Sequence, residues 1–152
     1  NVTLANNTCT LDNAGAGLYN AAGDSVLTNC ILYYNAANGE EQDERDQIAG
    51  SLGGVSVTYS CIDNLDIFGD PDFFNTPNPP LFVSEEADDY CLNNTDCGSD
   101  CASPAIDLGL DSAIGESLDL KKHTRKVNLR TGDNDVDMGP IETQNASGSP
   151  CG

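Results

Sequence analysis

Two heptapeptides near the N-terminus, Asn7-Thr-Cys-Thr-Leu-Asp-Asn13 and Asn29-Cys-Ile-Leu-Tyr-Tyr-Asn35, indicate the fold class of this chain. Their flanking asparagines match when the second segment is set below the first, and upstream Leu4 then falls over Val26. A third copy, Val57-Thr-Tyr-Ser-Cys61-Ile-Asp63, follows the second at a longer offset. Internal repetition at a period of 20–50 residues is typical of solenoid folds.

A period of about 22 residues with β-type side chains predicts a right-handed parallel β-helix, because three short strands and three turns consume about that number per coil. We expect about 3–4 coils over residues 1–83 and a less regular capping region over 84–152. Five apolar side chains are predicted to point inward: Leu4, Val26, Ile31, Val57 and Ile62. Cys30 and Cys61 are predicted to stack in one ladder as free buried thiols, since side chains on adjacent parallel strands do not converge enough for a disulfide.

The longer offset of the third copy is explained by an acidic insertion. The run Glu40-Glu-Gln-Asp-Glu-Arg-Asp-Gln47 carries five acids, and we expect residues 39–50 to form a solvated loop extruded from one turn. The whole chain is predicted to be one domain, because 152 residues with 38% apolar content supply a single core.

The charge of the chain excludes several partners. A formal net charge of −19 disfavours binding to nucleic acid and to anionic membranes. No apolar run approaches the roughly 20 residues of a transmembrane helix. The basic residues instead gather in one stretch, which reads either as a solvated loop or as a docking patch for an acidic neighbour: Lys121, Lys122, Arg125, Lys126 and Arg130.

Five short motifs occur in a fixed order along the chain: Asp70-Pro-Asp-Phe73, Asp89-Tyr-Cys-Leu92, Ser103-Pro-Ala-Ile-Asp-Leu-Gly109, Arg125, and Val136-Asp-Met-Gly-Pro-Ile-Glu142. With the Asn-rich repeats before them, they resemble the C-terminal part of bacterial surface β-helices called choice-of-anchor Q domains, in the pectate-lyase-like superfamily. The resemblance implies an all-β, right-handed parallel β-helix and a backbone-capping role for Asp137. Two departures are the Cys91–Cys101 insertion and the replacement of an Ala-Tyr pair by Pro140-Ile141.

Cysteines and glycosylation sequons indicate an extracellular or cell-surface protein. Four cysteines are predicted to be mostly disulfide-bonded, with the pairing left open: Cys91, Cys97, Cys101 and Cys151. Glycan is expected on at least one of four Asn-x-Ser/Thr sites: Asn1, Asn6, Asn93 and Asn145.

The acidic residues suggest two kinds of functional site, a Ca²⁺ site and a catalytic carboxylate pair. Asp133, Asp135 and Asp137 alternate on an extended segment and could supply oxygen ligands to Ca²⁺, the one cofactor considered, although a polar turn is the favoured explanation of these acids. Polysaccharide hydrolysis would need a carboxylate pair, for which Asp63, Asp66, Asp70 and Asp72 are candidates. A polysaccharide lyase would use a Lys or Arg as its catalytic base beside a bound Ca²⁺. Arg45 is the only Lys or Arg in residues 1–83.

The sequence therefore favours a non-catalytic structural or adhesive module over its alternative, a polysaccharide lyase or glycoside hydrolase. Glycans are further possible partners. Because the repeat is already running at Asn1, we expect a longer surface protein or a second copy of the chain to cover the first coil. A head-to-tail contact would build a filament, steered by the stretch Lys121–Arg130 meeting the Glu40–Asp46 loop of a neighbour.

Overall fold

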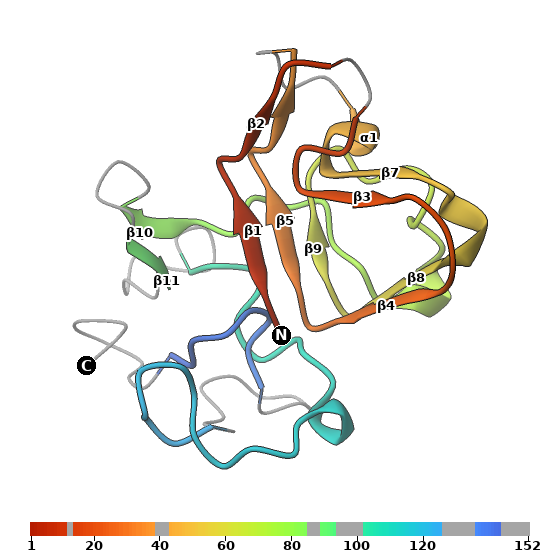
Figure 1. Cartoon of the computed structure of the whole chain (residues 1–152). Helices are drawn as coiled ribbons and strands as arrows, with labels where there is room; N and C mark the ends of the chain where they lie inside the picture. The colour runs from red at the N-terminus through yellow and green to blue at the C-terminus, as the bar shows by residue number, and fades with distance from the viewer. Residues whose placement is uncertain (12–13, 39–42, 85–88, 94–101, 126–135, 144–152) are drawn as a thin grey trace.

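Short strands and tight turns dominate the computed structural model, which describes every residue except 12–13, 39–42, 85–88, 94–101, 126–135 and 144–152 (Figure 1). Helix is limited in the described residues to α1 (Glu44–Gln47) and to the 3-10 turns η1 (Leu52–Gly54), η2 (Pro71–Phe73) and η4 (Asp111–Ala113). The chain is therefore all-β in class, as predicted. None of its described helices has the length and apolar character that crossing a membrane requires.

The first nine strands repeat one path. A first circuit comprises β1 (Thr3–Ala5), β2 (Thr8–Cys9), β3 (Leu18–Asn20) and β4 (Ser25–Thr28). A second circuit comprises β5 (Ile31–Tyr33), β6 (Ala36–Ala37), β7 (Ile48–Gly50) and β8 (Val55–Thr58), and β9 (Cys61–Ile62) begins a third. Each strand of the first circuit pairs in parallel with its counterpart in the second, and β9 extends the first sheet to the order β1-β5-β9 (Figure 1).

The repeat is longer than the sequence alignment suggested. Thr3 lies opposite Ile31, and Ile31 lies opposite Cys61, so the shorter period that the alignment predicted is wrong. The alignment was misled by asparagines: the counterpart of Asn7 is Asn35, whose Oδ1 accepts hydrogen bonds from both the backbone and the side chain of Asn7. A circuit has four strand positions, and these consume more of the chain than the three that were assumed.

Left-handed corners turn the chain into and out of the three-stranded sheet. The corner before it carries Asn29, Tyr59 and Phe74, with φ of 56°, 50° and 57°. The corner after it repeats the same conformation at Asn6, Tyr34 and Asn64. Asn visits this region at low cost, whereas Tyr and Phe do so at a penalty that neighbouring packing must offset. The stacked rings of Tyr59 and Phe74, 4.8 Å apart, supply such packing.

The three-stranded sheet separates two apolar clusters. Leu32, Ile62 and Val57 face the interior of the circuits with Phe68, while Ile31, Tyr33 and Cys61 face the opposite side. Because side chains alternate along a strand, a register error of one residue moves a side chain to the other face. That error affected two predictions below.

The predicted inward set is right at three of five positions. Val57 and Ile62 are at most 1% exposed, and Leu4 packs half-buried against the interior cluster. Ile31 is 1% exposed but faces the opposite side of the sheet, with Cys61. Val26 is 78% exposed, because Val57 lies opposite Leu27 and not opposite Val26. The circuit therefore turns Leu27 inward and Val26 outward.

The predicted Cys30–Cys61 ladder fails for the same reason. Cys61 lies opposite Ile31, so the two sulfurs belong to different clusters on opposite faces of the sheet. Both are free buried thiols, as expected, although not through the stacking that was argued. Burial raises the pKa of the Cys61 thiol, and the carboxylate of Asp63 adds to the effect.

The acidic insertion is not a solvated loop throughout. Its second half forms α1 and buries Glu44, Asp46 and Gln47, while residues 39–42 lie outside the described part of the chain. The Glu44 carboxylate accepts the backbone N–H groups of Ile67 (2.5 Å) and Phe68 (3.3 Å). The predicted solvated loop is therefore wrong at 44–50. Glu44 satisfies backbone N–H groups that would otherwise be buried without partners, and residues 48–50 form β7, with Ile48 and Ala49 buried.

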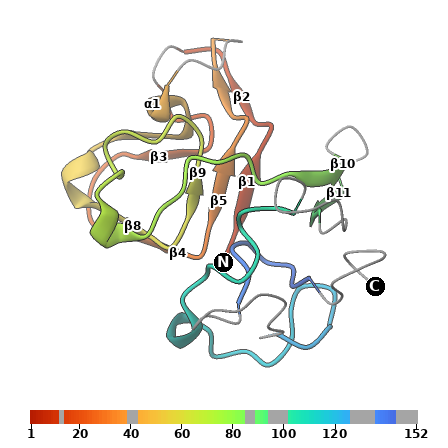
Figure 2. The same cartoon turned by 180° about the vertical axis from the view of Figure 1, so that it is seen from behind.

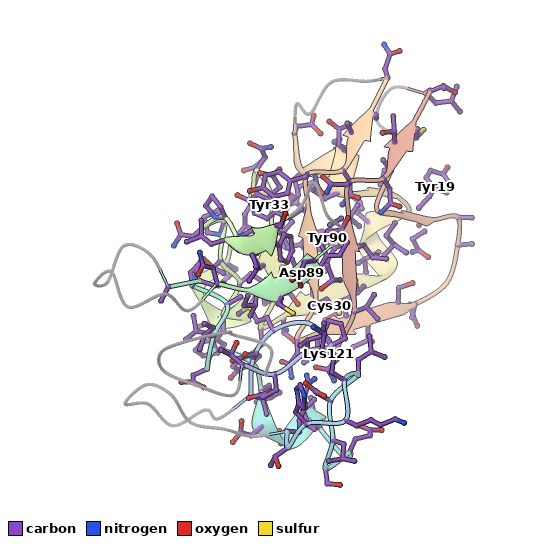
Figure 3. All side chains as sticks on the ribbon, turned by 90° about the vertical axis from the view of Figure 1, so that its left-hand side faces the viewer. Tyr19, Cys30, Tyr33, Asp89, Tyr90 and Lys121 are labelled. Atoms are coloured by element: carbon purple, nitrogen blue, oxygen red, sulfur yellow. The ribbon has the colours of Figure 1, made fainter. Side chains whose placement is uncertain are left out.

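The C-terminal part covers the outer face of the three-stranded sheet. β10 (Phe82–Ser84) and β11 (Asp89–Leu92) form an antiparallel pair, and β10 spans the expected boundary at residue 83. Phe82, Leu92, Ile106 and Met138 pack in one cluster with Ile31. Figure 2 shows the two parts from behind, and Figure 3 shows Asp89 and Tyr90 on the strand pair that lies over the sheet.

Candidate functional site

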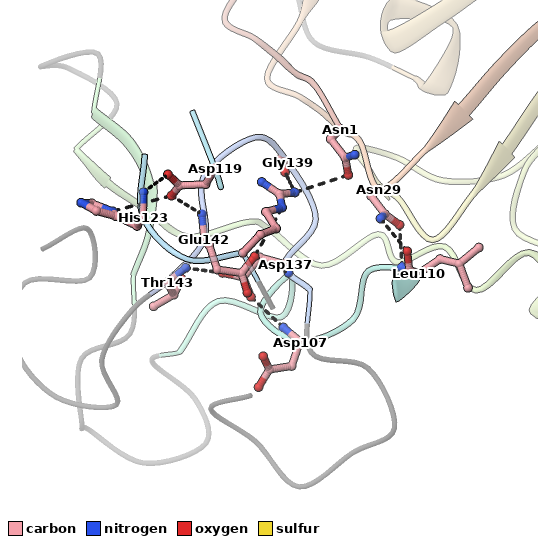
Figure 4. Close-up of polar contacts among 11 residues, drawn as sticks. Asn1, Asn29, Asp107, Leu110, Asp119, His123, Asp137, Gly139, Glu142 and Thr143 are labelled. Atoms are coloured by element: carbon pink, nitrogen blue, oxygen red, sulfur yellow. Dashed lines mark hydrogen bonds and ion pairs between the residues drawn. The ribbon is translucent and has the colours of Figure 1, made fainter. Parts of the chain in front are cut away.

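Three buried carboxylates meet where the C-terminal segments cross. Asp107, Asp137 and Glu142 are at most 4% exposed, and one oxygen from each lies within 4.8 Å of the others. An antiparallel bridge between Gly109 and Val136 brings the two segments together. The cluster is thus made by two loops that are distant in sequence (Figure 4).

Backbone N–H groups donate hydrogen bonds to the carboxylate oxygens of this cluster. Asp137 accepts the N–H of Asp107 on Oδ1 at 2.9 Å and the N–H of Thr143 on Oδ2 at 2.7 Å. Glu142 Oε2 accepts the N–H of Asp137 at 3.3 Å. The carboxylates therefore fasten the loops to each other, which is the capping role that the resemblance implies for Asp137.

Arg125 supplies the positive charge. Its Nε lies 3.6 Å from Glu142 Oε2, and its Nη2 donates to the carbonyl of Gly139 at 2.7 Å and to Asn1 Oδ1 at 3.4 Å. The residue is 6% exposed. A buried cation beside three buried acids lowers the cost of removing them from water.

A second arm extends from Glu142 towards the surface. The N–H of Glu142 donates to Asp119 Oδ2 at 3.0 Å, and Asp119 Oδ1 accepts the N–H of His123 at 2.7 Å. His123 Nδ1 lies 3.7 Å from Asp119 Oδ2. Asp119 thus connects Glu142 in the interior to His123, which is half-buried.

Burial raises the pKa of Asp137 to about 6, while the hydrogen bonds from Thr143 and Asp107 oppose the rise. A carboxyl group that titrates near neutral pH has the property of a general acid. Asp137 is nevertheless 0% exposed, so a substrate cannot reach it in this conformation.

The predicted Ca²⁺ ligands are only partly visible. Asp133 and Asp135 lie outside the described residues, and Asp137 belongs to the buried trio instead of an open extended segment. Carboxylate oxygens are the ligands that Ca²⁺ takes, and here the single positive charge of Arg125 offsets part of the charge of the trio. The Ca²⁺ site stays a prediction.

The acids expected for sugar hydrolysis do not form a buried pair. Asp63 is buried, and its Oδ2 accepts the N–H of Tyr34 at 3.4 Å. Asp66, Asp70 and Asp72 are exposed, and Asp70 Oδ1 caps the N–H of Asp72 at 2.9 Å. Their arrangement is that of a solvated turn with one internal cap.

The basic stretch is not a continuous surface patch. Lys121 and Lys122 are exposed, whereas Arg125 is buried, and Lys126 and Arg130 lie outside the described residues. Arg125 is therefore wrong as a subunit contact, because its guanidinium is used inside the C-terminal region. On the opposite side of the predicted contact, Glu44 and Asp46 are likewise buried.

The cysteine and glycan predictions fall mostly on residues outside the described part. Cys91 is buried and disulfide-bonded, and the three cysteines with which it could pair are not described: Cys97, Cys101 and Cys151. Lys121 Nζ donates to its sulfur at 3.0 Å. Of the sequon asparagines, Asn1 and Asn6 are exposed, Asn93 is half-buried, and Asn145 lies outside the described residues.

Sequence reasoning missed three members of the buried network, Asp107, Asp119 and Glu142, and it also missed the separate buried acid Glu44. A usable signal existed for the first three: Asp107 and Glu142 stand in motifs bounded by apolar residues, Ala105-Ile106 and Met138, and Asp119 stands between Leu118 and Leu120. An acid inside an apolar motif is a candidate for a buried, partnered group. Glu44 lies in an acidic run that gave no such signal.

The comparisons with known proteins add no relative: no protein-family model, curated protein or solved structure matches this chain.

Proposed function

We propose that the chain is a non-catalytic structural module of an extracellular or cell-surface protein, built on a right-handed parallel β-helix. The parallel pairing of Thr3 with Ile31 and of Ile31 with Cys61, together with the repeated left-handed corners, supports the β-helix. Right-handed connection between parallel strands is the general rule for such crossovers.

The observation that carries this proposal is the use made of the buried acids. Asp137, Glu142 and Asp119 accept backbone N–H groups from the C-terminal loops, and Arg125 forms a buried ion pair with Glu142. Groups used in this way hold a rigid cap on the outer face of the sheet. Asp119 and Arg125 also line a hollow of about 260 Å³, but the hydrogen bonds and the ion pair named here are made within the protein.

The resemblance to choice-of-anchor Q domains agrees with this role. Its motif residues Asp107, Arg125, Asp137 and Glu142 all fall within the one buried network. We propose that the motif residues shared with this family are those whose hydrogen bonds and ion pair hold the C-terminal region on the circuits. The family assignment itself remains a proposal that rests on the motifs.

An extracellular location is part of the proposal. It is supported by the disulfide-bonded Cys91 and by the exposed sequon residues Asn1 and Asn6. An intact mass of protein from its native source should exceed the mass calculated from the sequence by one or more glycans. A native mass equal to the calculated mass would contradict the glycan prediction.

An activity assay separates the structural role from its alternative, polysaccharide cleavage. The chain is incubated with neutral and acidic polysaccharides, with and without Ca²⁺, and new reducing ends and unsaturated uronides are measured. We expect no release above a heat-inactivated control. Release that is lost in Asp66→Asn or Asp70→Asn, with the melting temperature unchanged, would overturn the proposal in favour of a glycosidase or lyase.

A further inference from the structure

One glycosylation sequon lies at the corner that leads out of β1. Asn6-Asn7-Thr8 fits the Asn-x-Ser/Thr pattern, and all three residues are exposed. Asn6 has a φ of 56° and belongs to the row of left-handed corners that includes Tyr34. The acceptor asparagine and the hydroxyl residue of this sequon therefore both stand at the surface of the folded chain.

The other three sequons are less open. In the first of them, Asn1 Oδ1 accepts a hydrogen bond from the buried Arg125 at 3.4 Å, and the hydroxyl oxygen of Thr3 is buried. Asn93 is half-buried, and the rest of its sequon lies outside the described residues, as does the sequon at Asn145. Because the folded chain has to accommodate an attached oligosaccharide, the described structure favours the corner site.

A tyrosine of the C-terminal strand pair lies beside the Asn6 side chain. Asn6 Nδ2 donates to the hydroxyl oxygen of Tyr90 at 3.3 Å. Tyr90 stands on β11, over the three-stranded sheet (Figure 3), and its ring meets Phe82 of β10 edge to face, with centroids 5.2 Å apart. Tyr34, the counterpart of Asn6 in the second circuit, packs against the same cluster. The nitrogen that would carry a sugar thus stands next to an aromatic side chain on which the sugar can rest.

We propose that Asn6 carries an N-linked glycan whose first sugar packs against Tyr90 and holds the first circuit to the strand pair β10–β11. The apolar face of a pyranose ring and an aromatic ring remove each other from water. This inference rests on the extracellular location proposed above. It assigns the modification to one residue and gives the glycan a structural role.

The donor of the glycan is a lipid diphosphate-linked oligosaccharide. Asn6 Nδ2 forms a bond to the anomeric carbon of the first sugar, the bond from that carbon to the diphosphate oxygen breaks, and Nδ2 loses one proton. The lipid diphosphate leaves. The second hydrogen on Nδ2 remains, so the hydrogen bond to Tyr90 is compatible with the modification.

Peptide mapping of protein from its native source tests the site. Enzymatic release of the glycan in heavy-oxygen water converts a glycosylated asparagine into a labelled aspartate, so the mass of each peptide identifies the modified residue. We expect the label at Asn6. An unmodified Asn6 in the native protein would overturn the inference.

Two substitutions of Thr8 form a matched pair, because Thr8→Ser keeps the sequon and Thr8→Ala removes it. Both variants are made in a eukaryotic secretory host and, without glycan, in the bacterial periplasm, which also permits disulfides. The difference between the two unglycosylated forms is subtracted. We expect the glycan to raise the melting temperature by about 2–4 °C. In a Tyr90→Leu background the rise should fall below about 1 °C, whereas Tyr90→Phe keeps the ring and should retain the rise.

A glycan at Asn6 that leaves the melting temperature unchanged, or whose effect survives Tyr90→Leu, would overturn the packing against Tyr90. If Tyr90→Leu does not fold, the Thr8 pair and Tyr90→Phe still decide whether the glycan stabilises the chain. Failure here is distinguishable from failure of the proposed function. A chain without glycan at Asn6 leaves the structural role intact, whereas polysaccharide cleavage would overturn that role whatever Asn6 carries.

Discussion

Replacing Arg125 by methionine tests whether the buried network holds the C-terminal region in place. Methionine keeps an unbranched apolar stem and removes the guanidinium. The Glu142 carboxylate, 0% exposed, would then lose its cation at 3.6 Å, and the Gly139 carbonyl would lose its donor. Three carboxylates would remain clustered without a positive charge.

The expected loss of unfolding free energy follows from the distance between Arg125 and Glu142. At an effective dielectric constant of about 20, unit charges 3.6 Å apart attract by about 4–5 kcal/mol. The variant also avoids the free-energy cost of burying a guanidinium, and this gain offsets part of the lost attraction. Breaking a buried pair by removing one partner costs about 3–5 kcal/mol, and we expect Arg125→Met to lower the free energy of unfolding by that amount.

Urea unfolding followed by circular dichroism measures the change, with Glu142→Gln and the double variant completing a thermodynamic cycle. We expect a coupling of about 2–3 kcal/mol between Arg125 and Glu142. Lys122→Met, at an exposed position, is the control and should change stability by less than about 0.5 kcal/mol. The deficit of Arg125→Met should shrink as the pH falls, because protonation neutralises the remaining acids. A loss below about 1 kcal/mol, or an additive cycle, would refute the reasoning.

Four further expectations concern other parts of the chain. The pKa of Asp137 is raised to about 6 by burial, so its contribution favours the folded state fully below the unfolded value of 3.8 and is lost as the pH rises through 6. Wild type should therefore gain up to roughly 3 kcal/mol more than Asp137→Asn between pH 7 and pH 4, and parallel pH curves in urea unfolding would contradict this. Glu44→Gln should cost about 1–3 kcal/mol in thermal unfolding, because one of two buried amides loses its charged acceptor. Gly50→Ala should cost more than about 2 kcal/mol, since φ is +97° and a Cβ would meet the carbonyl of the paired strand, whereas Gly53→Ala, with open space around it, should be neutral; equal melting temperatures would show the argument wrong. Cys61, 0% exposed, should resist iodoacetamide until the protein unfolds, as mass spectrometry of labelled peptides would show; labelling in the native state would argue against the described packing.

The repeated segments and the abundance of turn residues were enough to indicate the class of the fold. Abundant turn residues and short β-type runs predicted strands without appreciable helix, and repeated Asn-rich segments indicated that the chain retraces its path. Local chemistry also identified Ile62 as an interior residue and Ile31 as a buried one. These features are readable because they depend on each segment's own composition.

Register depended on information that no single segment carries. Asn7 could be aligned with Asn29 or with Asn35, and only the hydrogen bonds of Asn35 to Asn7 and to Gln47 decide between them. The insertion was equally ambiguous, because a run of acids reads as solvated unless a distant turn, here Ile67-Phe68, presents its amides to Glu44.

For the candidate site, too, the sequence showed the motifs but not how they come together. The motifs around Asp107, Asp137 and Glu142 were visible in the sequence, but each motif alone reads as a polar turn. The sequence by itself determined an all-β chain that repeats its path and carries acids in apolar surroundings. Only the tertiary structure decided that Arg125 joins those acids in the interior and not a neighbour at the surface. The physical reason is that burial creates the need for a partner, and burial is a property of the assembled loops, which no local pattern encodes.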